Sequence, residues 1–150
     1  MSETSNFLGI VSGERSRSHA EVADRADRIA SGLSQIGVGQ GDCVCMLMRN
    51  DIAFVEAAYG AMRLGAYGVP INWHFKPEEI NYILTDTGTS VLIGHADMLH
   101  ALRDAIPHGV SAQRADAAGD PVQLQDRSRS SEDAGLRDRF RILARTTRAL

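Results

Sequence analysis

Residues 41–94 read GDCVCMLMRNDIAFVEAAYGAMRLGAYGVPINWHFKPEEINYILTDTGTSVLIG, and this stretch decides the fold class. Short apolar runs alternate in it with amphipathic segments, in a strand-helix-strand-helix-strand order of nearly minimal length. A parallel βαβ crossover needs about a dozen or more residues, and its helix must cover one face of the sheet. The stretch therefore predicts an α/β fold, a partial doubly wound sheet with alternating strands and helices.

Composition excludes several classes of protein. The chain has 150 residues, enough for one domain with a real core. Hydrophobic residues make up 43% and the formal net charge is −3, values that suit a globular protein and argue against a nucleic-acid partner. No apolar run approaches the roughly 18 residues that span a bilayer, and residues 1–13 do not read as a targeting leader. We expect a cytoplasmic protein without a transmembrane segment.

Local signals place the first elements. Residues 7–11 and 15–18 flank a Ser-Gly turn and predict a hairpin. Ser18 and Glu21 have the spacing of a capping box at the start of a helix, and Gly37 is expected to end that helix in a left-handed conformation.

The same reasoning orders the elements up to Val110. Strands are expected at 44–48, 67–71 and 91–93. Asn50 or Asp51 is expected to cap the second helix. The third helix should begin at Pro77, and a last one should end at Pro107. The second helix is expected to bury the face formed by Phe54, Val55, Ala58, Tyr59 and Met62.

The composition changes after Val110. Residues 1–110 carry eight basic and thirteen acidic side chains, whereas residues 111–150 carry eight arginines against six acidic side chains, so the charge moves from −5 to +2. We therefore divide the chain into a domain at 1–110 and an arginine-rich tail at 111–150. The tail shows no strand-like run, and its first part, to about residue 130, has the composition of a disordered segment.

The end of the tail has helical periodicity. One side of such a helix would carry apolar residues and its other sides arginines. A basic amphipathic helix can contact membranes or acidic partners, although a solvated chain end is the favoured interpretation. The apolar positions are Leu136, Phe140, Leu143 and Thr147, and the arginines are Arg137, Arg141, Arg145 and Arg148.

No metal or phosphate site is assigned. Cys43 and Cys45 are the only cysteines; we expected their side chains on opposite faces of a strand, each with a small buried apolar role. His95 and His100, five residues apart, do not share a helix face. The G-x-G-x-G at 37–41 ends a helix and leads into a strand, the reverse of a phosphate-binding glycine loop, so it is interpreted as a connector.

Three stretches together resemble a known family, the AMP-forming acyl-CoA synthetases or adenylate-forming ligases. Residues 16–42 are similar to the family's first helix and its (T/S)-Y-x-E-L entry, with His19 in place of the aromatic residue. Residues 49–72 resemble N-x-x-x-F-x-x-A-x-x-G-A-x-x-x-G-A-x-x-x-P-x-N. Residues 72–93 are similar to N-x-x-x-x-x-x-E-(I/L)-x-Y-(I/L)-L-x-D-(S/T)-G, and their Asn-Trp-His start is typical of the fatty-acid-type members.

The resemblance implies the N-terminal part of a ligase large domain and a two-step reaction. A carboxylate attacks ATP to give an acyl-adenylate and pyrophosphate, and coenzyme A then displaces AMP. ATP, magnesium and coenzyme A are thus implied for the full-length family, with a small carboxylic acid as substrate. The family's T-S-G-T-T-G-x-P-K-G loop, its Y-G-x-T-E segment, its ribose-binding aspartate and its C-terminal lysine are absent from this sequence. No catalytic, cofactor-binding or metal residue is therefore assigned, and the isolated chain is expected to be inactive.

A few residues have two readings. Asn72, Trp73 and His74 follow a strand, where α/β sheets place ligands, so a role near an acyl pocket is one reading. In the favoured reading Trp73 packs and His74 caps a loop. Lys76 reads as a solvated surface charge. Glu78 and its neighbour Glu79 point about 100° apart on a helix, so they favour the helix dipole and do not share a proton.

Two further hypotheses concern the chain as a whole. The arginine-rich tail could come from a frameshift or a premature stop in a longer ligase gene. Alternatively, the chain is a stand-alone α/β binding or regulatory module without catalysis. A ligase fragment should expose an unpaired sheet edge and tend to self-associate, whereas a module should unfold cooperatively as a monomer.

Overall fold

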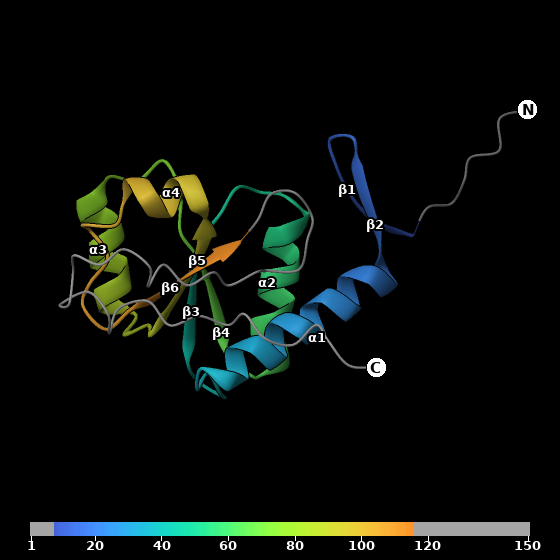
Figure 1. The fold of residues 1–150 in the computed structure, drawn as a ribbon, viewed down its shortest axis with the longest axis horizontal. Helices are drawn as coiled ribbons and strands as arrows, with labels where there is room; N and C mark the ends of the chain where they lie inside the picture. The colour runs from blue at the N-terminus through green and yellow to red at the C-terminus, as the bar shows by residue number, and fades with distance from the viewer. Residues whose placement is uncertain (1–7, 116–150) are drawn as a thin grey trace, which may run out of the picture.

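The computed structural model describes residues 8–115 and shows a four-stranded parallel sheet with helices on both faces, preceded by a hairpin (Figure 1). The strand order in the sheet is β4-β3-β5-β6. The predicted doubly wound α/β architecture is confirmed. The strands are β1 (Gly9–Ser12), β2 (Arg15–Ser18), β3 (Cys43–Leu47), β4 (Tyr67–Pro70), β5 (Val91–His95) and β6 (Ser111–Ala115). The helices are α1 (His19–Gln35), α2 (Ile52–Arg63), α3 (Pro77–Asp86) and α4 (Ala96–Ala101).

The central strand β3 supplies both halves of the core. Val44 and Met46 belong to the cluster that packs against α1 and α2, whereas Cys45 and Leu47 belong to the cluster under α3 and α4. Figure 1 shows the two helix pairs on opposite sides of the sheet. Because successive side chains of a strand point to opposite faces, one five-residue strand is buried on both.

The same alternation corrects our expectation for the cysteines. Residues two apart in a strand share a face, so Cys43 lies on the face of Cys45, not opposite it. Burial raises the pKa of the Cys45 thiol, and its sulfur lies 3.5 Å from Thr87 Oγ1. A thiol that is hard to ionise is unreactive, which supports the structural role expected for Cys45.

The helix starts follow the local sequence signals. Ser18 Oγ accepts from the Glu21 amide at 3.2 Å, and the Ser18 amide donates to Glu21 Oε2 at 2.8 Å, so the capping box is confirmed. The Ser18 amide bond is also the main cause of the lowered pKa of Glu21. Asp51 caps α2 by accepting from the Phe54 amide at 3.2 Å. Gly37 ends α1 at a φ of 91°.

The buried face of α2 differs from the one we expected. Tyr59 and Met62 are 44% and 65% exposed, and the buried positions include Ala57, Gly60 and Ala61. The reason is the close approach of α1: a Cβ added at Gly60 would lie 2.5 Å from Ile29 Cγ2. Only small side chains fit between the two helices, so the bulky ones turn outward.

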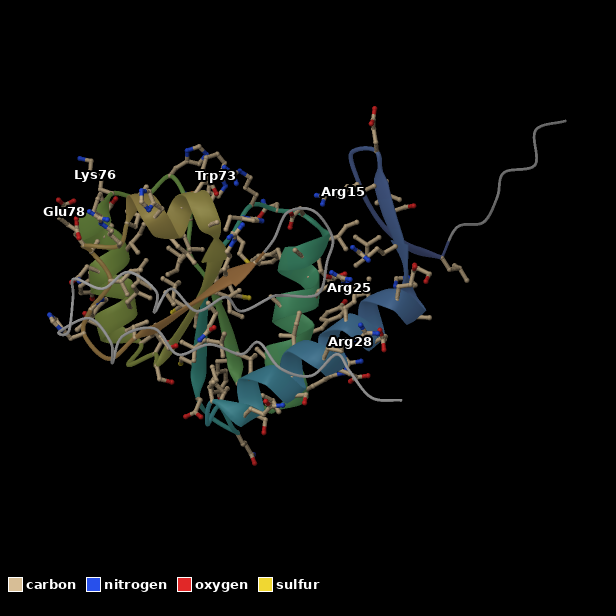
Figure 2. All side chains as sticks on the ribbon, in the orientation of Figure 1. Arg15, Arg25, Arg28, Trp73, Lys76 and Glu78 are labelled. Atoms are coloured by element: carbon tan, nitrogen blue, oxygen red, sulfur yellow. The ribbon has the colours of Figure 1, made fainter. Side chains whose placement is uncertain are left out.

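A buried carboxylate joins the hairpin to the two helices. Glu56 on α2 is 2% exposed, and its oxygens lie 3.1 Å from Arg17 Nε and 2.9 Å from Arg25 Nε. Arg17 belongs to β2 and Arg25 to α1, and Figure 2 shows Arg25 in the region where α1 meets α2. Two guanidinium groups thus compensate one charge that is removed from water.

The last strand corrects our interpretation of the tail. Residues 111–115, expected to lack a strand, form β6 and pair in parallel with β5, and Gln113 and Ala115 are buried. The predicted last helix is also shorter than expected, since α4 ends at Ala101 and does not reach Pro107. The disorder expected as far as residue 130 and the predicted terminal helix concern residues that, beyond 115, lie outside those described. Among the helices described in 8–115, none has the length and hydrophobicity needed to cross a membrane.

Replacing Glu56 by alanine should lower the free energy of unfolding by about 2–4 kcal/mol, because two partly buried guanidinium groups lose their counter-charge. The matched control is Asp24→Ala, which removes the exposed ion pair with Arg28 and should cost about 0.5 kcal/mol or less. Chemical denaturation of the two variants gives the comparison. Equal losses in both variants would show that the Glu56 cluster has no special stabilising role.

Candidate functional site

The strand order defines where this fold can place a ligand. The chain passes from β3 through α2 to the neighbouring β4, and it then crosses over β3 to reach β5 on the other side. The crossovers therefore diverge between β3 and β5 (Figure 1). In open α/β sheets, ligands bind at the carboxyl ends of the strands beside such a switch point. We define Arg49, Asp51, His95 and Asp97, which lie at or just beyond the ends of β3 and β5, as the switch-point cluster.

An ion pair joins the two sides of the switch-point cluster. Arg49, two residues after β3, contacts Asp97 beyond β5, with Nη2 to Oδ2 at 2.6 Å and Nη1 to Oδ1 at 3.4 Å. The hydrogen bond from Arg49 lowers the pKa of Asp97, and the same bond raises the pKa of Arg49. Both side chains are about half exposed or more, so water screens the pair and its geometry matters more than its energy.

The loop after β4 contributes aromatic rings to the same edge. The Arg49 guanidinium carbon lies 5.9 Å from the centroid of the Trp73 ring, within the range of a cation–π contact. The Trp73 ring is 42% exposed and stacks on the His74 ring, with centroids 3.6 Å apart. Figure 2 shows Trp73 at this upper edge of the sheet.

A buried histidine lies beneath the ion pair. His95, the last residue of β5, is 2% exposed, and its Nδ1 accepts from the Arg49 amide at 3.2 Å. In the neutral imidazole the proton is therefore on Nε2, which lies 3.5 Å from Asp51 Oδ2. The same Asp51 oxygen lies 3.5 Å from Arg15 Nη2 of the hairpin. His95 thus links β3 to the cap of α2 from inside the sheet.

Our sequence candidates fall at or near this edge, but the cluster itself was not predicted. Asn72 Oδ1 accepts from the His74 amide at 3.0 Å, so the side chain that caps this loop is Asn72 and not His74, and Trp73, which was expected to pack, is 42% exposed. Lys76 is exposed at the start of α3, where its amide donates to Glu79 Oε2 at 2.8 Å. Of the cluster residues, only Asp51 had a role in our sequence analysis, as a cap. The missed residues are Arg49, His95 and Asp97, and position directly after a strand was the signal that could have found them.

The chemistry available at the switch-point cluster is limited. Arg49 is neutralised by Asp97, and the Asp51 carboxylate already faces His95 and Arg15. Within residues 8–115 no group of three or more His, Cys, Asp or Glu side chains could hold a metal ion. An open pocket of about 400 Å³ lies instead on the outer side of α3, with Phe75 and Tyr82 among its lining residues. The switch-point cluster can order the edge of the sheet, and the loop after β4 adds one exposed aromatic ring, Trp73, beside it.

The fold and its switch point define a doubly wound α/β unit of the kind that binds ligands at one sheet edge. The comparisons with known proteins narrow this class. A family model described as AMP-binding enzyme matches residues 3–143, so the chain belongs to this family. The match continues beyond Val110, into the part of the chain that we expected to be an atypical tail.

Relatives and solved structures agree with the family. Feruloyl-CoA synthase from Amycolatopsis sp. is 36% identical over 122 residues, which cover 76% of this chain and 25% of that protein. Long-chain-fatty-acid–CoA ligase FadD13 from Mycobacterium tuberculosis is 40% identical over 75 residues, 50% of this chain and 15% of that protein. This chain therefore spans about a quarter or less of the length of these relatives.

Structural neighbours show the same fold. The N-terminal domain of FACL13 from Mycobacterium tuberculosis superposes with a TM-score of 0.60 at 33% identity, covering 66% of this chain and 26% of that one. A benzoate CoA ligase from Burkholderia xenovorans LB400 gives a TM-score of 0.68 at 23% identity, covering 73% and 22%, and supports the fold alone.

Replacing His95 by leucine should lower the free energy of unfolding by about 1–3 kcal/mol, because the Arg49 amide loses its buried acceptor. His95→Asn is the matched control, since its side-chain oxygen can stand where Nδ1 accepts the bond, and it should retain more of the stability. Urea denaturation of the three proteins measures both effects. A leucine variant as stable as the asparagine variant would show that this hydrogen bond does not hold the edge together.

Proposed function

We propose that this chain forms the first part of the large domain of an AMP-forming acyl-CoA ligase. The observation that carries the proposal is the family match over residues 3–143 on a doubly wound α/β fold. The complete enzyme would convert a carboxylic acid, ATP and coenzyme A into an acyl-CoA, AMP and pyrophosphate. In that enzyme this segment orders one sheet and one ligand-facing edge.

The described residues do not fit the nucleotide. A departing pyrophosphate needs several N–H groups and a cation that are free to receive its charge. Arg49 is engaged with Asp97, and the side chain of Lys76 is exposed at the start of α3, where no glycine-rich loop accompanies it. ATP, magnesium and coenzyme A are therefore proposed for the complete enzyme, and no step of the reaction is assigned to a residue here. We propose that the isolated chain is inactive.

Only the names of relatives and one short sequence bear on which acyl substrate the complete enzyme would use. The two relatives above are a feruloyl-CoA synthase and a long-chain-fatty-acid–CoA ligase, so aromatic and aliphatic acids are both represented. The Asn-Trp-His sequence at 72–74 is typical of the fatty-acid-type members, and it supports a place in fatty-acid metabolism. The acidic balance supports a protein without a nucleic-acid partner, and a cytoplasmic location stays a prediction.

Self-association through the sheet edge remains a prediction. Its strength depends on how many backbone N–H groups β4 directs away from β3. The Tyr67 amide donates to Asp42 O at 2.7 Å and the Ile71 amide to Met46 O at 2.8 Å, so both positions face β3. The alternation of a parallel ladder then directs the backbone of positions 68 and 70 outward. Pro70 has no N–H, so the free edge of β4 offers few donors to another strand. Any self-association through this edge should be weak.

Incubating the isolated chain with ATP, magnesium, coenzyme A and either a long-chain fatty acid or ferulate should release no pyrophosphate above a blank without carboxylate. The expected reason is that this sequence lacks the glycine-rich loop and lysine with which the family stabilises the charge that develops. A coupled pyrophosphate assay measures this, with a full-length relative as the positive control. Carboxylate-dependent release from highly purified chain would contradict the proposed inactivity.

A hybrid enzyme tests whether this chain can serve as the first part of a ligase large domain. Residues 8–115 would replace the matching part of the Amycolatopsis feruloyl-CoA synthase. The hybrid should retain activity within about a hundredfold of the parent, since small misplacements from an exchanged scaffold cost up to this much. A hybrid carrying Glu56→Ala is the matched control and should be less stable. A hybrid that folds, by circular dichroism and gel filtration, but makes no feruloyl-CoA would refute the proposal.

A further inference from the structure

The outer side of α3 carries an apolar groove with an acidic rim. The pocket has a volume of about 400 Å³ and is lined by Phe75, Glu78, Glu79, Tyr82 and Ile83. Phe75 and Tyr82 are 39% and 67% exposed, which is unusual for two aromatic rings so close together. Figure 2 shows Lys76 and Glu78 at the outer end of α3, directed away from the sheet. The groove therefore faces solvent and not the core.

Acidic side chains outnumber basic ones beside the groove, where Lys76 precedes α3. Helix α3, PEEINYILTD, holds three acidic side chains and no basic one. Glu78 and Tyr82 are four residues apart, as are Glu79 and Ile83, so an acidic group and an apolar group follow each other along two neighbouring lines of the helix. A partner that fits this face needs apolar side chains beside a row of positive charges.

One segment of this chain has that pattern. Residues 136–148 read LRDRFRILARTTR, with five arginines and one aspartate. Leu136, Phe140 and Leu143 recur at helical spacing, and Arg137, Arg141 and Arg145 follow them one or two positions later. Such a spacing places a basic line beside an apolar line on a helix. On α3 the acidic pair Glu78 and Glu79 lies one turn before the apolar pair Tyr82 and Ile83. A helix that crosses α3 at a steep angle can therefore set its basic line against the first pair and its apolar line against the second.

The connection between the two is long enough. Twenty residues, 116–135, separate the end of β6 from Leu136. A flexible chain of this length has a root-mean-square span of about 25 Å, and a domain of this size has a radius of gyration of about 13 Å. The segment can therefore reach α3, and tethering gives it an effective concentration in the millimolar range. A weak contact between two complementary faces is then sufficient for occupancy.

We propose that residues 136–148 dock on the α3 groove of the same chain, with their apolar side chains over Phe75 and Tyr82 and their arginines facing Glu78 and Glu79. The inference does not depend on the ligase function. It gives the basic segment of the chain an acidic binding surface within the same molecule.

Photo-crosslinking in the full chain tests the proposal. Tyr82 is replaced by p-benzoylphenylalanine, and the matched control carries the same group at Tyr67, which is 66% exposed against 67% for Tyr82 but lies on β4. After illumination, monomeric and dimeric products are separated by size, and mass spectrometry maps the crosslinks in each. Position 82 should crosslink to residues 136–148 about tenfold more than position 67, because both positions share the same tether and only docking on α3 holds the segment beside position 82. One molar salt should lower the yield by screening the arginines.

Two variants separate docking from random contact. Phe140→Ser combined with Leu143→Ser removes the apolar line and should lower the crosslink yield about tenfold. Ile142→Ser removes an apolar side chain from the opposite side of the same helical pattern and should leave the yield unchanged. The proposal is overturned by equal yields from positions 67 and 82, by products that join two copies of the chain, or by a double variant that crosslinks as well as the parent.

Discussion

A parallel sheet is stable only when both of its faces are covered, and this requirement organises the structure. Strand β3 has five residues, and it contributes Val44 and Met46 to one core cluster and Cys45 and Leu47 to the other. The crossovers must then place α2 on one face and α3 on the other. That division makes the strand order diverge between β3 and β5, so the switch point is a consequence of covering the sheet.

The same requirement explains which elements could be predicted from sequence. Strand runs, the capping box at Ser18 and the cap at Asp51 depend on neighbours within a few residues, and all are confirmed. The buried face of α2 could not be found in this way, because it is set by Ile29 of α1 pressing on Gly60. A prediction based on large hydrophobic side chains buries Tyr59 and Met62. The narrow space between α1 and α2 instead admits only glycine and alanine. Strand β6 was not predicted for a similar reason. Its SAQRA sequence is polar, and its pairing with β5 supplies the stability.

The switch-point cluster was missed because its residues are distant in sequence. His95 and Arg49 lie 46 positions apart, and they meet only because β3 and β5 are neighbours in the sheet. A lone histidine at the end of an apolar run has no spacing that marks it. Its partners become visible once the strand order is known. The loop at 72–74, in contrast, was found because it follows a strand and contains aromatic residues.

The charged groups in residues 8–115 mainly hold the fold together. Glu56 compensates Arg17 and Arg25, and Asp97 compensates Arg49, so these guanidinium groups are not available to a phosphate. A nucleotidyl transfer site needs the opposite arrangement, in which cations and N–H groups await the charge that develops in the transition state. In the complete ligase that we propose, this arrangement would come from other parts of the enzyme, and the paired charges of this segment would order the edge of the sheet.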